Sequence, residues 1–224
     1  MQCGVAVKVI IWGSHFMGHQ GRFGKYGENK RLERLRRAGN RDVTDRAVKV
    51  GPGEARSFFK KKATQRARIR IGPAGALDLD FIKVLSGRAF QKYGSYQDVI
   101  SQWFQSEMTE TIVGRIERRP VGFAMIGLVE DEDPVQKVCE LLAIAVELDK
   151  RHKGIGQMLM TAVDKKAVEW QMERIVLHTA EENLPARSLF TKNGFIPWGM
   201  NPHFYPAGQD ALVMSKVIHS QSVP

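Results

Sequence analysis

Cysteines are scarce in this chain, and it has no long apolar run. The 224 residues contain two cysteines, Cys3 and Cys139, which form no metal-ligand pattern and indicate no disulfide framework. No apolar run approaches the roughly 20 residues of a membrane-spanning helix. The stretch Val5–Trp12 is apolar apart from Lys8, yet it lacks the charged start and the small-residue cleavage site of a signal peptide. We therefore expect a cytoplasmic protein in a reducing setting, with no membrane contact and no metal site.

Acidic residues are scarce in the first third, which carries the basicity of the whole chain. The formal net charge is +10. Residues 1–70 contain 18 Lys and Arg against 5 Asp and Glu, a balance of +13, whereas the remainder contains 16 against 19, a balance of −3. Sustained apolar periodicity is also lacking there. We predict that residues 1–65 form a basic, disordered or loosely helical extension and that residues 66–220 form the folded domain.

Two other interpretations of this basic extension stay open. Its charge is also typical of an electrostatic arm that contacts nucleic acid or the surface of the ribosome. Alternatively, the natural start of the protein lies downstream, and the segment is not part of the working protein.

A strand, a basic glycine-containing turn and a helix follow one another in the middle of the chain. The apolar run Leu141–Val146 predicts a buried strand, and apolar residues recur at helical spacing from Ile155 onward. Between them lie Gly154 and Gly156, which permit a tight turn and leave no Cβ in the way of a ligand. Three basic residues, Arg151, His152 and Lys153, stand beside the unpaired N–H groups of the helix start. This combination suits a diphosphate.

The segment Arg151-His-Lys-Gly-Ile-Gly156 resembles the [Q/R]-x-x-G-x-[G/A] loop of the GNAT superfamily of N-acetyltransferases. In that family the backbone amides of the loop hold the pyrophosphate of acetyl-CoA. The resemblance therefore implies acetyl-CoA as co-substrate, with contacts from Ile144, Ala145, Val146, Arg151, His152, Lys153, Gly154, Ile155 and Gly156. The residues alone leave open an ordinary strand-to-helix turn. A Rossmann loop is disfavoured because Leu159 stands where its third glycine belongs.

A second segment, Asn183–Phe195, resembles the family pattern N-x-x-A-x-x-L-[Y/F]-x-x-x-G-F and follows the first at the usual separation. The resemblance adds Asn183 and Phe190 to the cofactor-binding residues. Both also have structural explanations, since Asn183 is a good helix N-cap and Phe190 belongs to an apolar helix face.

The order of patterns along the chain predicts the fold. We expect strands at 67–71, 111–117, 121–129, 138–146, 174–179 and 211–217, a broken strand near Phe195, and helices at 77–90, 96–106, 155–170 and 184–192. Arg118–Pro120 is predicted to form a hairpin turn, and Glu130–Pro134 an acidic loop. This order matches GNAT proteins over about residues 67–218. The expected class is α/β, with the GNAT (acyl-CoA N-acyltransferase) fold: a mixed, mostly antiparallel central sheet flanked by helices.

Three residues are candidates for catalysis. The segment Phe204–Met214 resembles the Y-Y-P-x-x-x-x-D-A-x-x-M end of ribosomal-protein-alanine N-acetyltransferases, which implies a protein N-terminal amine as acceptor. Tyr205 of this segment is the candidate acid, because Phe190 replaces the usual tyrosine and has no proton to give. His178 stands where that branch carries a glutamate base, and histidine is a common general base. Glu147 is a further candidate base. The resemblance also implies an oxyanion donor on the backbone near Ala145 or Val146.

Other functions remain compatible with the sequence. The same fold could acetylate a small amine or an antibiotic, or bind acyl-CoA as a sensor without catalysis, as Phe190 suggests. The basic extension keeps open a nucleic-acid-binding protein. Monomer and homodimer are both consistent with the sequence.

Deleting residues 1–60 tests the predicted domain boundary. We expect the shortened protein to stay soluble, to melt within a few degrees of the full chain, and to turn over a small acceptor at an unchanged rate, because the deleted part lacks the apolar pattern of a core segment. Thermal unfolding and steady-state kinetics check this. An insoluble product, or a much lower melting temperature, would show that the extension is structural.

Overall fold

The computed structural model describes residues 69–129 and 137–218. The basic segment 1–65, Cys3 and the acidic stretch Glu130–Pro134 lie outside the described residues, so the predictions made for them stay predictions.

A seven-stranded sheet forms the centre of the described structure, in the order β1-β2-β3-β4-β5-β7-β6. All neighbouring strands are antiparallel except β4 and β5, which are parallel. The strands are β1 Ile69–Pro73, β2 Thr109–Ile116, β3 Arg119–Leu128, β4 Val138–Val146, β5 Arg174–Ala180, β6 Ile196–Asn201 and β7 Ala211–Val217. The helices are α3 Leu79–Phe90, α4 Gln97–Phe104, α5 Ile155–Glu169 and α6 Leu184–Lys192, with short 3-10 turns at Ala76–Asp78 and Leu148–Lys150. This arrangement confirms the predicted fold class.

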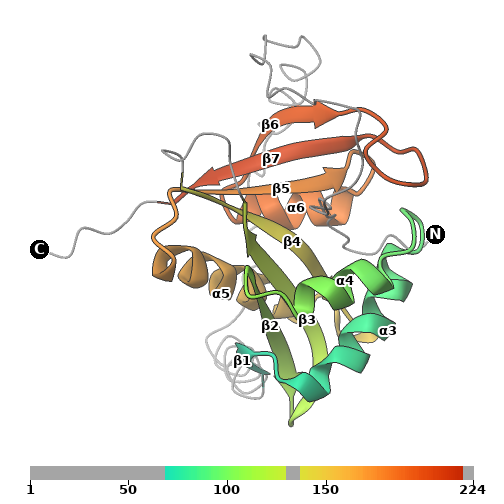
Figure 1. Cartoon of the computed structure of the whole chain (residues 1–224), viewed down its shortest axis with the longest axis vertical. Helices are drawn as coiled ribbons and strands as arrows, with labels where there is room; N and C mark the ends of the chain where they lie inside the picture. The colour runs from blue at the N-terminus through green and yellow to red at the C-terminus, as the bar shows by residue number, and fades with distance from the viewer. Residues whose placement is uncertain (1–68, 130–136, 219–224) are drawn as a thin grey trace, which may run out of the picture.

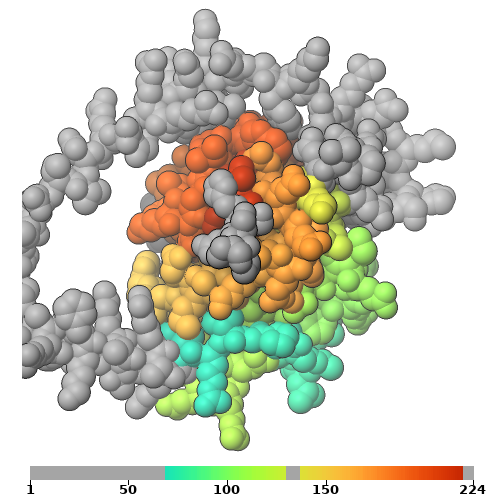
Figure 2. Space-filling model, turned by 90° about the vertical axis from the view of Figure 1, so that its left-hand side faces the viewer, coloured from blue at the N-terminus to red at the C-terminus, as the bar shows by residue number. Residues whose placement is uncertain are grey.

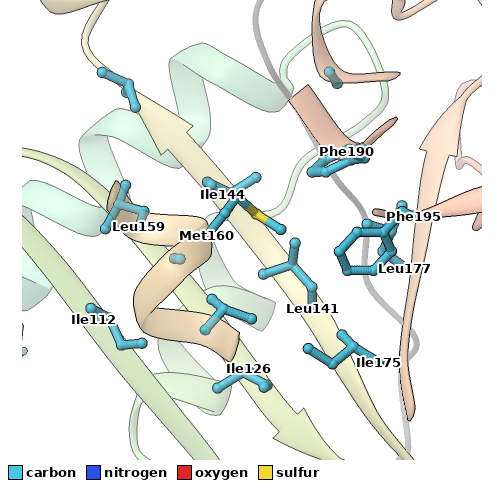
Figure 3. Packing of buried hydrophobic residues seen from close by; sticks show 14 of the residues in the cluster. Ile112, Ile126, Leu141, Ile144, Leu159, Met160, Ile175, Leu177, Phe190 and Phe195 are labelled. Atoms are coloured by element: carbon cyan, nitrogen blue, oxygen red, sulfur yellow. The ribbon is translucent and has the colours of Figure 1, made fainter. Parts of the chain in front are cut away.

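Helices cover both faces of the sheet, and each face has its own core (Figure 1). On one face α5 packs over β2, β3 and β4, and Phe190 of α6 belongs to the same core, where Leu141, Leu159 and Phe190 are fully buried (Figure 3). On the other face α3 and α4 pack over β2, β3 and β4 around Phe123 and Ile100. Seen from the side, the later elements, in orange, lie above the earlier ones, in teal and green (Figure 2).

The turn of the β2–β3 hairpin lies earlier than the sequence suggested. The β2–β3 hairpin turns at Glu117 and Arg118, which both have positive φ (49° and 75°), and not at Arg118–Pro120. A two-residue turn of this hand matches the twist of the flanking strands. Pro120 instead lies within β3, where the register with β2 shifts between Gly114 and Arg115. Proline cannot donate to a strand ladder, so an irregular position in the pairing accommodates it.

The first strand also runs further than predicted. We expected Gly72-Pro73 to end it, but β1 continues through Pro73. Proline is tolerated there because β1 is an edge strand. Within the described ranges, no helix is both long enough and apolar enough to cross a membrane.

Candidate active site

The strands β4 and β5 run side by side at their beginnings and then separate (Figure 1). Only Val138–Leu141 of β4 pairs with Arg174–Leu177 of β5. The separation begins at a bulge in β4, because Met125 of β3 pairs with Ala143 and Ile126 pairs with Leu141, which leaves Leu142 without a partner. An extra residue of this kind bends the strand that carries it. Beyond it, β4 is paired with β3 alone.

The register with β3 determines which backbone groups of β4 face this gap. The Glu147 N–H donates to the Val121 carbonyl at 2.9 Å. Since antiparallel ladders alternate, Ala145 and Ala143 also turn their amides toward β3, whereas Ile144 and Val146 turn theirs toward β5. The Arg151 side chain supports this orientation, because its Nε donates to the Val146 carbonyl at 3.2 Å from the gap side. Of the two oxyanion positions predicted, this geometry favours Val146 over Ala145 and adds Ile144.

The turn after β4 leaves the start of α5 open to a ligand. Gly154 is the N-cap residue with φ of 83°, and no side chain caps the helix. Its first internal bond is from Met158 N to Gly154 O, so the N–H groups of residues 155–157 have no intrahelical partner. A Cβ on Gly154 would meet nothing within 4 Å, which leaves room over the turn. His152 and Lys153 are exposed, while Ile155 is buried in the core and can offer only its backbone.

These features fit an extended ligand that carries a diphosphate. The gap offers unpaired backbone groups along β4, and the open helix start offers N–H groups and the positive end of the helix dipole. Arg151 lies between the two, and its burial lowers the pKa of its guanidinium. On the part of β5 that does not pair with β4, the buried Thr179 hydroxyl has no partner among the described residues.

Two cavities lie on the side of the sheet that α3 and α4 cover. The larger, of about 880 Å³, lies between α3 and the segment after β4 and is lined by Tyr93, Arg119, Glu147 and Arg151, among others. The smaller, of about 450 Å³, lies between the α3–α4 turn and the β6–β7 loop and is lined by Tyr96, Phe204 and Tyr205, among others. The buried Tyr96 hydroxyl has no hydrogen-bond partner in the described part of the chain.

The loop between β6 and β7 brings Tyr205 to the site. Two hydrogen bonds attach this loop to the α3–α4 turn. Ala207 N donates to the Tyr93 carbonyl, and the Gln209 side chain donates to the Lys92 carbonyl at 3.0 Å. Tyr205 is 3% exposed, and its ring lies 4.8 Å from that of Tyr93. Burial, and then the neighbouring tyrosines, raise the pKa of Tyr205 far above its usual value. The phenol is therefore held in its protonated form, as an acid requires.

The candidate base His178 is buried with both ring nitrogens occupied. Nδ1 lies 2.9 Å from Glu140 Oε1, and Nε2 lies 3.1 Å from Asn201 Nδ2. The ring stacks on Phe204 at 4.3 Å, and Phe204 also contacts the Tyr205 ring, so one aromatic side chain touches both candidates. His178 is the first residue of β5 beyond its pairing with β4.

The other candidate base, Glu147, lies at the larger cavity. Its Oε1 accepts from Arg119 at 3.1 Å, and its buried Oε2 has no partner among the described residues. Glu147 follows Ile144 and Val146 along the chain, so it lies farther from the start of the gap than His178 does.

Asn183 and Phe190 both have structural roles. The Asn183 side chain accepts from Ala186 N and caps α6. Phe190 is fully buried against Phe195 and lines neither cavity. Their predicted cofactor contacts stay predictions, and the burial of Phe190 does not favour its contact.

Sequence reasoning did not single out Glu140 or Asn201. Glu140 is the one charged residue of β4, and a lone carboxylate in a buried strand was a signal that could have been used. Asn201 had no such signal, because its contact with His178 depends on how the strands are ordered in the sheet. In the described ranges, no group of three or more His, Cys, Asp or Glu side chains could hold a metal ion.

Comparison with known proteins places most of the described chain in one family. Residues 80–195 match the family model described as Acetyltransferase (GNAT) family. A protein of Bacillus subtilis (strain 168) with the provisional name ribosomal protein bS18-alanine N-acetyltransferase is 22% identical over 138 residues, which cover 61% of this chain and 87% of that protein.

Solved structures share the fold. The ribosomal-protein-S18-alanine N-acetyltransferase from Escherichia coli is 18% identical and superposes with a TM-score of 0.57, over 70% of this chain and 99% of that one. YncA from Salmonella typhimurium, named provisionally as an acetyltransferase and solved with its cofactor acetyl-CoA, is 16% identical with a TM-score of 0.60, over 70% of this chain and 98% of that one.

Replacing Gly156 by glutamate tests the proposed diphosphate position. A Cβ there would lie 3.3 Å from the tip of Leu189, a flexible contact that can yield, so we expect the fold to survive. The new carboxylate would repel the diphosphate by several kcal/mol and weaken acetyl-CoA binding at least about a hundredfold in titration calorimetry. Gly156→Gln, with similar bulk and no charge, is the matched control and should weaken binding less. Unchanged affinity in a folded Gly156→Glu protein would show that the turn does not hold the cofactor.

Proposed function

Since the chain belongs to the GNAT family of acetyltransferases, which use acetyl-CoA, we propose that its acceptor is the α-amine at a protein N-terminus. The observation that carries this proposal is the smaller cavity. It lies between the α3–α4 turn and the β6–β7 loop and is lined by Tyr205, which packs in the same buried cluster as Ala145 of β4 and Ala180 of β5.

The chemistry of this cavity suits the end of a peptide. Aromatic rings of Tyr96, Phe204 and Tyr205 offer apolar contact, and the unpartnered Tyr96 hydroxyl offers a hydrogen bond to a peptide group. Burial raises the pKa of Tyr96, which keeps this hydroxyl protonated. The names of the Bacillus and Escherichia relatives, which refer to N-acetylation of an alanine of a ribosomal protein, support a protein acceptor.

The residues around the gap have complementary roles in the proposed reaction. An ammonium acceptor must lose a proton before its nitrogen can attack the thioester carbonyl, and we assign that proton to His178. The N–H of Ile144 or Val146 stabilises the charge that develops on the carbonyl oxygen. When the carbon–sulfur bond breaks, the Tyr205 hydroxyl supplies the proton that the leaving thiolate accepts, and the second proton of the attacking nitrogen returns to the Tyr205 oxygen as the amide forms. Glu147 is the alternative base, since one of its oxygens is unpartnered at the larger cavity.

One observation favours a second candidate acceptor, a small amine that carries a carboxylate. The larger cavity is lined by four cationic side chains and two acidic ones. Arg88 stands in this lining, and a carboxylate bound there would gain a charge-assisted hydrogen bond. Glutamate-like amines would then fit the cavity better than a peptide end does.

An acceptor comparison tests the proposal directly. We expect acetyl transfer to a peptide with a free N-terminal alanine to have a kcat/KM at least about tenfold above that of amino-acid or polyamine acceptors, a difference of about 1.4 kcal/mol. The matched control is the same peptide with a blocked N-terminus and an internal lysine. Mass spectrometry locates the acetyl group.

Transfer to the blocked peptide, or a preference for the carboxylate-bearing amine, would contradict the proposal. In the second case, Arg88→Gln should lower turnover of that amine and leave transfer to polyamines unchanged. No transfer to any acceptor, with acetyl-CoA still bound, would favour the sensor alternative.

Tyr205→Phe tests the proposed acid. Removing the hydroxyl deletes a donor that matters chiefly in the transition state, so kcat should fall at least about tenfold while the KM for acetyl-CoA stays within about twofold. Steady-state rates between about pH 6 and pH 9 check this, since the phenol of the unchanged protein stays protonated there. Tyr96→Phe is the control, and it should raise the KM of the peptide more than it lowers kcat. A wild-type kcat in Tyr205→Phe would eliminate Tyr205 as the acid.

A further inference from the structure

We propose that Glu140 is a positioning residue for the reaction, which holds the His178 ring so that Nε2 is its proton-accepting atom. This inference rests on the proposed function, because it takes His178 as the base. It concerns a buried pair on neighbouring strands, Glu140 on β4 and His178 on β5, at the place where these strands begin to separate.

Glu140 and His178 form a buried polar pair. Their side chains are 3% and 6% exposed, and Glu140 Oε1 lies 2.9 Å from His178 Nδ1. A buried carboxylate without a partner costs several kcal/mol, so this contact is what makes Glu140 tolerable in β4. Replacing a buried ion pair by apolar residues does not in general lower stability. Stability therefore does not explain why the pair is present, and a functional reason remains.

The contacts of the ring define its tautomer. Asn201 Nδ2 donates toward Nε2 at 3.1 Å, so Nε2 accepts, and Nδ1 must carry the proton that it donates to Glu140. The neutral ring therefore presents a lone pair at Nε2. Asn201 occupies the position from which a proton would arrive, and an ammonium group that donates to Nε2 would take its place.

The proton transfer balances without any other reactant. The N–H bond of the acceptor ammonium breaks, a bond to Nε2 forms, and the nitrogen keeps the electron pair with which it attacks the thioester. His178 becomes an imidazolium that stays bonded to the Glu140 carboxylate, and Glu140 itself gains no proton. Solvent removes the proton from Nε2 after turnover.

The location of the pair agrees with this role. The backbone amide of Ile144, which faces the gap, lies four residues after Glu140 and two after the bulge at Leu142. His178 is the first residue of β5 beyond its pairing with β4, and its ring is stacked against Phe204, next to Tyr205. The pair therefore lies at the start of the gap, and Phe204 contacts both its His178 ring and the proposed acid.

The test combines kinetics with a spectroscopic measurement on the unliganded protein. Glu140→Met keeps the length of the side chain and removes both the acceptor and the charge, whereas Glu140→Gln keeps an acceptor and removes the charge alone. We expect Glu140→Met to lower kcat at least about tenfold with little change in the KM of either substrate. The kcat of Glu140→Gln should lie between that of Glu140→Met and that of the unchanged protein.

Nitrogen-15 NMR of the histidine rings reports the tautomer directly, with the His178 signals assigned by their loss in His178→Gln. In the unchanged protein and in Glu140→Gln, Nδ1 should be protonated and Nε2 unprotonated. In Glu140→Met this single tautomer should be lost. Asp164→Asn removes a carboxylate from an ion pair with Lys216 on the α5 face and serves as the control, with kcat and tautomer both unchanged.

The outcomes separate this inference from the proposed function. If Glu140 acts through His178, Glu140→Met should have no further effect on kcat in a His178→Gln background. A wild-type kcat in Glu140→Met, an unchanged tautomer, or an equal loss in both backgrounds overturns the positioning role. If His178→Gln itself keeps a wild-type kcat, the assignment of His178 as the base fails, and with it this inference, while the N-terminal acceptor is still tested by the peptide comparison.

Discussion

The bulge at Leu142 is the constraint on which the rest of the site depends. The sheet is continuous from β1 to β6, and within it β4 and β5 are paired over only four residues. One extra residue in β4 turns the strand away from β5 without breaking its ladder with β3. Backbone groups that would otherwise be satisfied within the sheet are thereby left for a ligand, and a buried unpaired amide is costly until it finds one.

The two faces of the sheet have different roles at the gap between β4 and β5. The α5 face is an apolar core that fixes the helix start and its glycine turn against β4. The opposite face gathers tyrosines, His178 and Glu140, together with the loop that is fastened to the α3–α4 turn. The apolar packing of the α5 face therefore supports the polar side chains of the opposite face. The gap between β4 and β5 connects the two faces.

Much of the fold could be predicted from the sequence because its strongest signals are local. The bounds of β4, α6 and β7 agree with the prediction, since each is a compact apolar pattern between turn residues. The family and its co-substrate could likewise be predicted from two short motifs. The hairpin turn at Glu117 was missed because Pro120 looked like a turn residue, whereas the register shift in the pairing with β2 accommodates it within β3.

The site was less predictable because its contacts join distant parts of the chain. Glu140, His178 and Asn201 come from three strands, and their meeting requires the sheet order β4-β5-β7-β6. Sequence alone suggested His178 and Glu147 as separate bases and gave no sign that Glu140 pairs with His178. The roles of residues 1–65, the oligomeric state and a cytoplasmic setting stay predictions.

Amide hydrogen exchange at single-residue resolution tests the central claim most directly, namely that the gap between β4 and β5 holds the thioester arm of acetyl-CoA. Ile144 turns its amide into the gap, while Ala143 and Ala145, its neighbours in the same strand, turn theirs toward β3. We predict that acetyl-CoA slows exchange at Ile144 far more than at Ala143 or Ala145. Equal protection of all three amides, or no change at Ile144 under saturating acetyl-CoA, would contradict the account.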